Sequence, residues 1–271
     1  MPDGAADREV PQLGGRMTPG VVRVGDTVRR PGSPASPFVA QLLTHLASRG
    51  FEGAPGYLGE DRAGREILTY VPGEVPAKWR AFADEQVARA AILLRRMHDA
   101  SRDLAERLGG GDVVCHHDPG PNNTVFRDGL PVAFIDFDFA AVGDPLEDVG
   151  YLAWSWCVSS KPARGPATGQ ARQVRVLADA YGLSEDQRRR LPAAIENRFI
   201  RNDRFWGDRA CRHREGPAGS GAAEMLAWTR QEAAHFASRR PTFAAALDAP
   251  CRAEVAQRRP DPVRASTANR P

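Results

Sequence analysis

The sequence has very little lysine. Only Lys78 and Lys161 occur in 271 residues, and the other 35 of the 37 basic residues are arginines. A phosphate-binding loop of the form G-x-x-x-x-G-K-[ST] is absent, which excludes the nucleotide hydrolases built on that loop. No lysine precedes position 78, so any phosphate contact in the first 77 residues must come from arginine or from backbone N–H groups.

Cysteines and long apolar runs are also scarce. The four cysteines lie far apart without a C-x-x-C pair, which argues against a zinc ribbon or a disulfide framework and favours buried thiols. No run of 18 apolar residues occurs, and the N-terminus lacks a basic segment followed by an apolar one, so we expect a cytoplasmic protein with no membrane partner. The net charge of +3 comes from arginines scattered along the chain, so we expect no nucleic-acid partner.

Residues 1–71 have the pattern of a small β-rich lobe that contains one helix. The β-branched runs are separated by turn residues such as Gly25-Asp26, which is typical of hairpins. A helix is expected at Ser36, which precedes a proline and an apolar stripe. Pro72-Gly73 interrupts a β-ladder, so we place the lobe boundary after Val71. The expected strands cover 21–24, 27–29, 56–60 and 65–71.

The pattern of residues 72–257 predicts a second lobe that is mainly helical and contains one β segment. Together with the β-rich first lobe, this predicts an α+β protein of two lobes. The run Asp144-Pro145-Leu146-Glu147 has the form of a capping box and predicts a helix start. Trp154 and Trp156 are two apart on that helix and cannot share a face, so we expect at least one in the core. Residues 258–271 are expected to be a disordered tail. The expected strands cover 113–115, 124–126 and 132–135, and the other expected helices cover 84–100, 168–181, 185–211, 222–239 and 242–257.

Polar residues concentrate in one loop, His116-His117-Asp118-Pro119-Gly120-Pro121-Asn122-Asn123, between two β segments. Asp136 follows thirteen residues after Asn123, at the end of another apolar strand. In phosphoryl transfer, a loop Asp accepts the substrate's hydroxyl proton, an Asn five residues later holds Mg²⁺, and an Asp after a strand holds Mg²⁺ as well. Amide and carboxylate oxygens suit that metal. The spacing therefore predicts Asp118 as the base and Asn123 and Asp136 as metal ligands.

The same residues resemble a known family. The pattern His116-x-Asp118-x-x-x-x-Asn123, followed by Ile135-Asp136-Phe137 and Gly143-Asp144-Pro145, is similar to that of the aminoglycoside phosphotransferase and choline kinase group. The resemblance implies a bilobal protein-kinase-like fold, with a small, reduced β-rich N-lobe and a mainly helical C-lobe. It also implies ATP as co-substrate, Mg²⁺ as cofactor and transfer of the γ-phosphate to a hydroxyl of a small molecule. His116 would then brace the catalytic loop.

The resemblance extends into the N-lobe. Thr27-Val28-Arg29-Arg30-Pro31 is similar to the family's third strand, and Ile67 to Gly73 is similar to its interlobe hinge, which implies that the nucleotide base contacts backbone near Tyr70 and Val71. Kinases normally pair a third-strand lysine with a helix glutamate. The aligned positions here are Arg29 and Val39, so the usual ion pair is absent. Because guanidinium binds phosphate bidentately, we expect Arg29 to contact the α- and β-phosphates.

Several assignments stay open. Asp138 stands where protein kinases have the glycine after Asp-Phe, and it is either a supporting carboxylate or a further metal ligand. Asp148 either orients the catalytic loop or lies on a solvated helix face. His116 and His117 could instead serve a metal-dependent hydrolase, which we disfavour because adjacent strand residues point to opposite faces. The missing lysine favours a second alternative, a pseudokinase that acts as a nucleotide-binding interaction module.

The acceptor is constrained by the charge of one predicted helix region. From Ser184 to Glu215, nine arginines stand against six acidic residues. This balance does not suit a polycationic aminoglycoside, although folding could sort the charges onto different faces. We expect the partner to be a small hydroxylated acceptor: an aminoglycoside-like antibiotic, an amino alcohol or a related metabolite.

Overall fold

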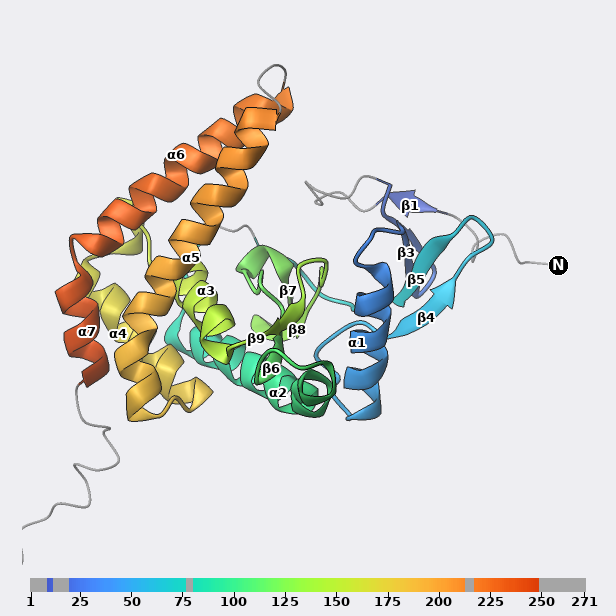
Figure 1. Ribbon diagram of the computed structural model, residues 1–271, viewed down its shortest axis with the longest axis horizontal. Helices are drawn as coiled ribbons and strands as arrows, with labels where there is room; N and C mark the ends of the chain where they lie inside the picture. Colours follow the sequence, from blue (N-terminus) through green and yellow to red (C-terminus); the bar gives the residue numbers. More distant parts are fainter. Residues whose placement is uncertain (1–8, 12–19, 77–79, 213–216, 249–271) are drawn as a thin grey trace, which may run out of the picture.

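The computed structural model describes residues 9–11, 20–76, 80–212 and 217–248. Figure 1 shows two lobes, a small one built on a sheet and a larger one built of helices. The expected α+β class with a bilobal, kinase-like arrangement is confirmed. The expected tail, 258–271, and the end of the last expected helix, 249–257, lie outside the described residues.

The N-lobe is a five-stranded antiparallel sheet with one helix, and both expected hairpins are confirmed. Gly25 adopts φ 57° in the first turn, a left-handed conformation that glycine accepts without strain. The helix α1 (Ser36–Ser48) buries a stripe of Val39, Leu42, Leu43 and Leu46. The sheet has the order β1-β2-β3-β5-β4. Its strands are β1 (Val10–Pro11), β2 (Val22–Val24), β3 (Thr27–Pro31), β4 (Tyr57–Glu60) and β5 (Arg65–Thr69).

Directly after the hinge, backbone hydrogen bonds fix the chain to Phe126 of the second lobe. The Glu74 N–H donates to the Phe126 carbonyl at 2.9 Å, and the Phe126 N–H donates to the Glu74 carbonyl at 2.7 Å. Gly73 precedes this bridge with φ 149°, and a Cβ there would lie 2.3 Å from the Phe126 carbonyl oxygen. Only glycine permits this close approach between the Gly73 and Phe126 backbones.

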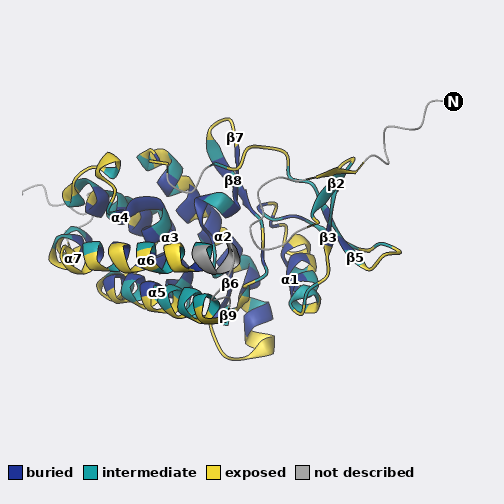
Figure 2. Cartoon of the chain, turned by 90° about the horizontal axis from the view of Figure 1, so that it is seen from above, coloured by how far each residue is buried: buried dark blue, intermediate teal, exposed yellow. Residues whose placement is uncertain are grey.

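In the C-lobe, α2 (Asp84–Leu108) packs against α3 and α4, and it also reaches α1 of the N-lobe (Figure 1). The expectation that α2 ends at residue 100 is wrong: it is one helix of 25 residues, because its apolar stripe continues through Leu104 and Ala105. Figure 2 shows buried residues on α2 and α3 and exposed faces on the outer helices. The helices are α2 (Asp84–Leu108), α3 (Pro145–Cys157), α4 (Ala167–Tyr181), α5 (Glu185–Arg212), α6 (Pro217–Ala237) and α7 (Arg240–Asp248), with short 3₁₀ turns η1 (Pro121–Asn123) and η2 (Pro162–Arg164).

Two small antiparallel pairs frame the polar loop between the helices. The strand β6 (Val113–Cys115) pairs with β9 (Ala141–Gly143), and β7 (Thr124–Arg127) pairs with β8 (Leu130–Phe134). The sequence did not predict β9, because three residues of mixed exposure carry no periodic pattern. Both ends of the polar loop are therefore fixed to short strands.

Both tryptophans of α3 are buried, on opposite sides of the helix. Trp154 packs against Phe199 of α5 with ring centroids 4.6 Å apart, and Trp156 packs against Phe82 at the same distance. The Trp156 indole N–H also donates to the Pro119 carbonyl at 3.1 Å. The expectation that at least one packs in the core is confirmed, and the second also supports the polar loop.

The remaining expectations from composition are met in part. Cys115 and Cys157 are buried as expected, whereas Cys211 is exposed. Within the described ranges, no helix is both long enough and apolar enough to cross a membrane.

The contact between α3 and α5 gives a stability prediction. A Cβ on Gly150 would lie 2.8 Å from the backbone carbon of Ala194 on α5, so Gly150→Ala overpacks this interface. We expect the free energy of unfolding to fall by about 1–3 kcal/mol in urea denaturation. Gly169 of α4 has no atom within 4 Å of such a Cβ, so Gly169→Ala should raise the same quantity by at most about 1 kcal/mol. Equal behaviour of the two variants would contradict the proposed close packing.

Candidate active site

A cavity of about 430 Å³ opens between the lobes and is called here the interlobe cleft. Val28 and Leu68 of the N-lobe sheet form one side, and Asp136 lies on the C-lobe side. Tyr70 and Val71 of the hinge also line it. The cleft therefore brings the expected hinge segment and one expected metal ligand to the same space.

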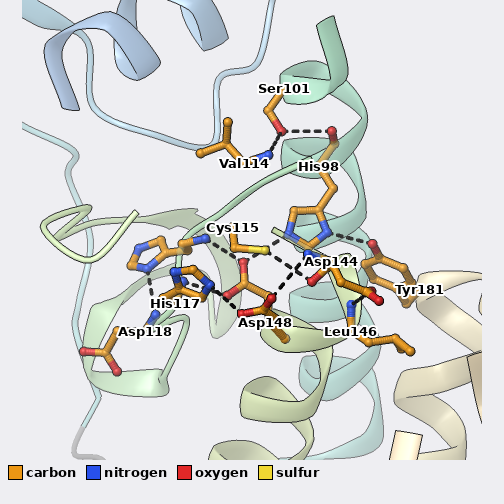
Figure 3. A network of polar contacts seen from close by, with 12 residues as sticks. His98, Ser101, Val114, Cys115, His117, Asp118, Asp144, Leu146, Asp148 and Tyr181 are labelled. Atoms are coloured by element: carbon orange, nitrogen blue, oxygen red, sulfur yellow. Dashed lines mark hydrogen bonds and ion pairs between the residues drawn. The ribbon is translucent and has the colours of Figure 1, made fainter. Parts of the chain in front are cut away.

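The polar loop is fixed by one buried carboxylate, Asp148 of α3. Its Oδ2 accepts the backbone N–H of His116 at 2.6 Å, and its Oδ1 accepts that of His117 at 2.7 Å. His98 of α2 places its Nε2 3.0 Å from the Asp148 Oδ2 and its Nδ1 2.7 Å from the Tyr181 hydroxyl (Figure 3). The sequence left open whether Asp148 orients the polar loop or lies on a solvated helix face. The structure shows that it is buried and orients the loop. No feature of the sequence pointed to His98, because a histidine inside an amphipathic helix has no distinctive pattern.

The electrostatics of Asp148 follow from these contacts. Burial alone would raise the pKa of its carboxyl, but the hydrogen bond from His98 and the nearby histidines outweigh burial and lower the pKa to about 2. Because this value lies below that of the unfolded chain, ionised Asp148 stabilises the fold above about pH 4. That contribution is lost as the pH falls toward 2.

Both histidines of the loop use both ring nitrogens. His116 accepts the Asp118 N–H at Nδ1 (3.3 Å), and its Nε2 lies 3.0 Å from the Ile135 carbonyl, which links the loop to the segment before Asp136. His117 lies 3.0 Å from the Phe139 carbonyl through Nδ1 and 3.0 Å from Glu147 through Nε2. Neither ring offers a nitrogen lone pair to a metal in this arrangement, which removes the main support for a hydrolase.

The structure brings Asp118, Asn123 and Asp136 together. The Asn123 side-chain N–H donates to the Asp118 Oδ2 at 2.7 Å and to the Asp118 carbonyl at 3.0 Å. Asp136 adopts φ 67°, an unfavourable conformation for a residue other than glycine. Asp136 keeps contact with solvent. Its carboxyl nevertheless has a raised pKa, first because protein atoms are packed around it and then because of the negative charge of Asp138. The charge of Asp118 raises the pKa further.

The third strand requires a correction. Arg29 lies on the face of β3 away from the cleft lining, with Nη1 3.6 Å from Asp61, whereas its neighbour Arg30 lines the cleft. Side chains alternate along a strand, so only one of two adjacent arginines can face the cleft. The helix α1 contributes no glutamate to β3, and a different ion-pair group is present. The buried Arg30 pairs through Nε with Glu66 of β5 at 2.6 Å and through Nη1 with Asp138 at 2.7 Å.

A second cavity of about 300 Å³ lies beside Asp118 and is called here the acceptor pocket. Sequence reasoning missed the side chains that α5 contributes to it. The only signal was the surplus of arginine in this region, and the sequence does not show which face of α5 turns inward. The lining residues are His117, Asp118, Phe139, Tyr151, Arg198, Arg201, Asn202, Phe205 and Trp206.

Fold and site together define a kinase-like phosphotransferase architecture, and comparison with known proteins agrees. The model of the phosphotransferase enzyme family matches residues 101–192, which include the polar loop and Asp136. A relative, the trifolitoxin immunity protein of Rhizobium leguminosarum bv. trifolii, is 38% identical over 200 residues, covering 65% of this chain and 74% of the relative. The chain belongs to the phosphotransferase enzyme family.

Solved structures show the same fold. A choline/ethanolamine kinase family protein from Mesorhizobium loti is 18% identical and matches with a TM-score of 0.58 over 90% of this chain and 94% of its own. An aminoglycoside phosphotransferase from Alicyclobacillus acidocaldarius is 15% identical and matches with a TM-score of 0.54 over 94% of each chain. At these identities the likeness establishes the fold alone.

The role of Asp148 gives a second prediction. Asp148→Ala would leave two backbone N–H groups and His98 without their acceptor in a buried place, so we expect the free energy of unfolding to fall by about 3 kcal/mol or more at pH 7. Asp99 of α2 forms only exposed ion pairs, with Arg95 and Arg102. Asp99→Ala should therefore change the same quantity by less than about 1 kcal/mol. A loss at Asp148 as small as that at Asp99 would show that the carboxylate does not hold the loop.

Proposed function

We propose that the protein transfers the γ-phosphate of ATP to a hydroxyl group of a small molecule. The observation that carries the proposal is the convergence of Asp118, Asn123 and Asp136 in a chain of the phosphotransferase enzyme family. Asp118 accepts the hydroxyl proton, the acceptor oxygen forms a bond to the γ-phosphorus, and the bond to the β-phosphate oxygen breaks to release ADP.

The contacts of Asp118 suit a base. Asn123 donates to its Oδ2, which orients the carboxylate and leaves the Oδ1 edge for a substrate hydroxyl. The buried Tyr151 lies beside Asp118, which, after burial, raises the pKa of the Tyr151 hydroxyl. Asp118 lines the acceptor pocket, so a hydroxyl bound there reaches the base directly.

The donor set fits a magnesium ion. Asn123 offers an amide oxygen and Asp136 a carboxylate, and Asp138 lies close enough to raise the pKa of Asp136. Clustered carboxylates that repel one another are stabilised by a divalent cation, which here would neutralise charge on the phosphates of the nucleotide. We propose Asn123 and Asp136 as its protein ligands and Asp138 as a supporting carboxylate.

The nucleotide is proposed to occupy the interlobe cleft. The buried Nη2 of Arg30 has no hydrogen-bond partner in the described structure, so a phosphate oxygen would supply one. The Tyr70 N–H already donates to the Asp26 carbonyl at 2.8 Å. The base contact proposed for the hinge therefore falls on the Tyr70 carbonyl and the Val71 backbone.

The relative also bears on the acceptor. A protein that confers immunity can act by modifying the toxic compound, and phosphorylation of a hydroxyl is one such modification. We therefore keep a small hydroxylated metabolite or antibiotic as the proposed acceptor. The pseudokinase alternative is weakened, because Arg30, Glu66 and Asp138 form an ion-pair group that can take the place of the usual strand–helix pair.

The base assignment gives a third prediction. Asp118→Asn should lower acceptor-dependent ADP formation by about 100-fold or more, since general-base catalysis supplies that much, and leave ATP affinity nearly unchanged. Asp136→Asn should instead weaken Mg²⁺-dependent ATP binding in calorimetry. Asp128, in the turn between β7 and β8, provides a matched control, because Asp128→Asn removes an exposed carboxylate outside both cavities. Full turnover in Asp118→Asn would refute the role of this residue.

The corrected third strand gives a fourth prediction. Arg30→Gln should weaken Mg·ATP binding by about tenfold or more, because a charged hydrogen bond to phosphate is lost. Arg29→Gln removes the same charge one residue away, on the opposite face of β3, and should leave the dissociation constant nearly unchanged. Isothermal titration with ATP and Mg²⁺ measures both, and a larger effect at Arg29 would reverse the assignment.

A further inference from the structure

The acceptor pocket carries more positive than negative charge. Among its described lining residues Asp118 is the only carboxylate, and it is the proposed base, whereas Arg198 and Arg201 both contribute guanidinium groups from α5. The His117 ring also favours its positively charged form. Burial alone would lower the pKa of His117, but the hydrogen bond to Glu147 outweighs burial and raises that pKa. A substrate with several ammonium groups would therefore meet cations on the wall of the pocket and no carboxylate beyond the base.

The two arginines differ in their partners. Arg201 forms an ion pair with Glu147, which already balances its charge. No ion pair formed within the described part of the chain includes Arg198, and its buried Nε has no hydrogen-bond partner there. The Arg198 guanidinium carbon lies 4.1 Å from the centroid of the Tyr151 ring, which holds it in place. Arg198 is thus a cation that is held against the Tyr151 ring and takes part in no ion pair among the described residues.

Arg198 also lies close to the base. Burial raises the pKa of the Tyr151 hydroxyl, and both Asp118 and Arg198 act on that pKa, Asp118 raising it and Arg198 lowering it. Both side chains also line the acceptor pocket, so the Arg198 guanidinium and the Asp118 carboxylate face the same small space. An anionic group bound by Arg198 would therefore belong to the same small molecule as the hydroxyl that Asp118 deprotonates, only a few bonds away from it.

The remaining wall of the pocket is aromatic. Phe139 and Phe205 pack edge to face with ring centroids 5.8 Å apart, and Phe205 packs against Trp206 in the same manner at 5.0 Å. Phe139 is 45% exposed, so part of its ring is open to a ligand in the pocket. This surface suits a ring or another apolar part of a ligand.

We propose that the acceptor is an anionic hydroxy compound, with a carboxylate or phosphate close to the reacting hydroxyl and an apolar ring or face, and that Arg198 binds its anionic group. This inference rests on the proposed function and specifies its substrate class. It separates this protein from phosphotransferases that act on polycationic acceptors, because the charge of the pocket has the opposite sign.

Four matched probes test the charge preference: 3-phenyllactate, 2-hydroxy-3-phenylpropyl phosphate, the neutral 3-phenyllactamide, and the cationic 1-amino-3-phenylpropan-2-ol. All four carry the same ring and hydroxyl, and the first two distinguish carboxylate from phosphate. Calorimetry on the full chain with saturating Mg²⁺ and ADP should show one or both anions binding at least about tenfold more tightly than the amide, and the amine most weakly. Equal affinities, tightest binding of the amine, or no binding of any probe would overturn the inference.

Variants on one helix assign the effect to a residue. Arg198→Gln should remove the preference for the anion, and Arg198→Lys should restore part of it. Arg189 lies on the same helix, is 60% exposed and lines neither cavity, so Arg189→Gln removes the same charge and should leave the preference unchanged. Thermal unfolding verifies that each variant is folded, and the wild-type series tests the charge preference without any variant. A preference that survives Arg198→Gln in folded protein would overturn the role of Arg198.

Phosphate transfer from ATP, measured on the same probes, separates this inference from the proposed function. Selective binding of an anion without any phosphorylated product would support the pocket assignment and contradict the phosphotransferase activity toward this class. Phosphorylation of the amine in preference to the anions would support the activity and overturn the anionic acceptor.

Discussion

The buried carboxylate of Asp148 is the constraint on which the rest of the site depends. It accepts the N–H groups of His116 and His117, and so it fixes the backbone immediately before Asp118. A buried carboxylate is stable only when charged or hydrogen-bonded partners surround it, and His98 from the neighbouring helix supplies the third. The position of the proposed base is thus set by contacts among α2, α3 and the end of β6, all within the rigid C-lobe.

The ion-pair group of Arg30 shows how a kinase-like cleft is organised here without the usual lysine. Arg30 and Glu66 face each other across neighbouring strands, in a register that the sheet itself enforces. Asp138 adds a carboxylate from the C-lobe, so the group also links the two lobes. The helix α1 contributes no acidic residue and presents an apolar stripe to the core. An ion pair between two strands, β3 and β5, therefore takes the place of the usual ion pair between the third strand and this helix.

Much of the site could be predicted from sequence because its residues are close in the chain. The five-residue step from Asp118 to Asn123 and the strand before Asp136 are local patterns, and the structure brings these residues together. The acceptor pocket could not be predicted in the same way. Its wall comes from α5, some 80 residues after Asp118, and which face of α5 turns inward depends on its packing against α3.

The sequence by itself determined the two-lobe α+β class, most of the strands and helices, and the order of the polar residues, because periodicity, capping residues and turn residues act over a few positions. It also determined that arginine must replace lysine. Only the tertiary structure decided that Arg30 and not Arg29 faces the cleft, since the two differ by one step of strand alternation, and that Glu66 and Asp138 are its partners. It alone decided that Arg198 lines the same pocket as Asp118 and takes part in no ion pair among the described residues, because packing decides which charges far apart in sequence meet.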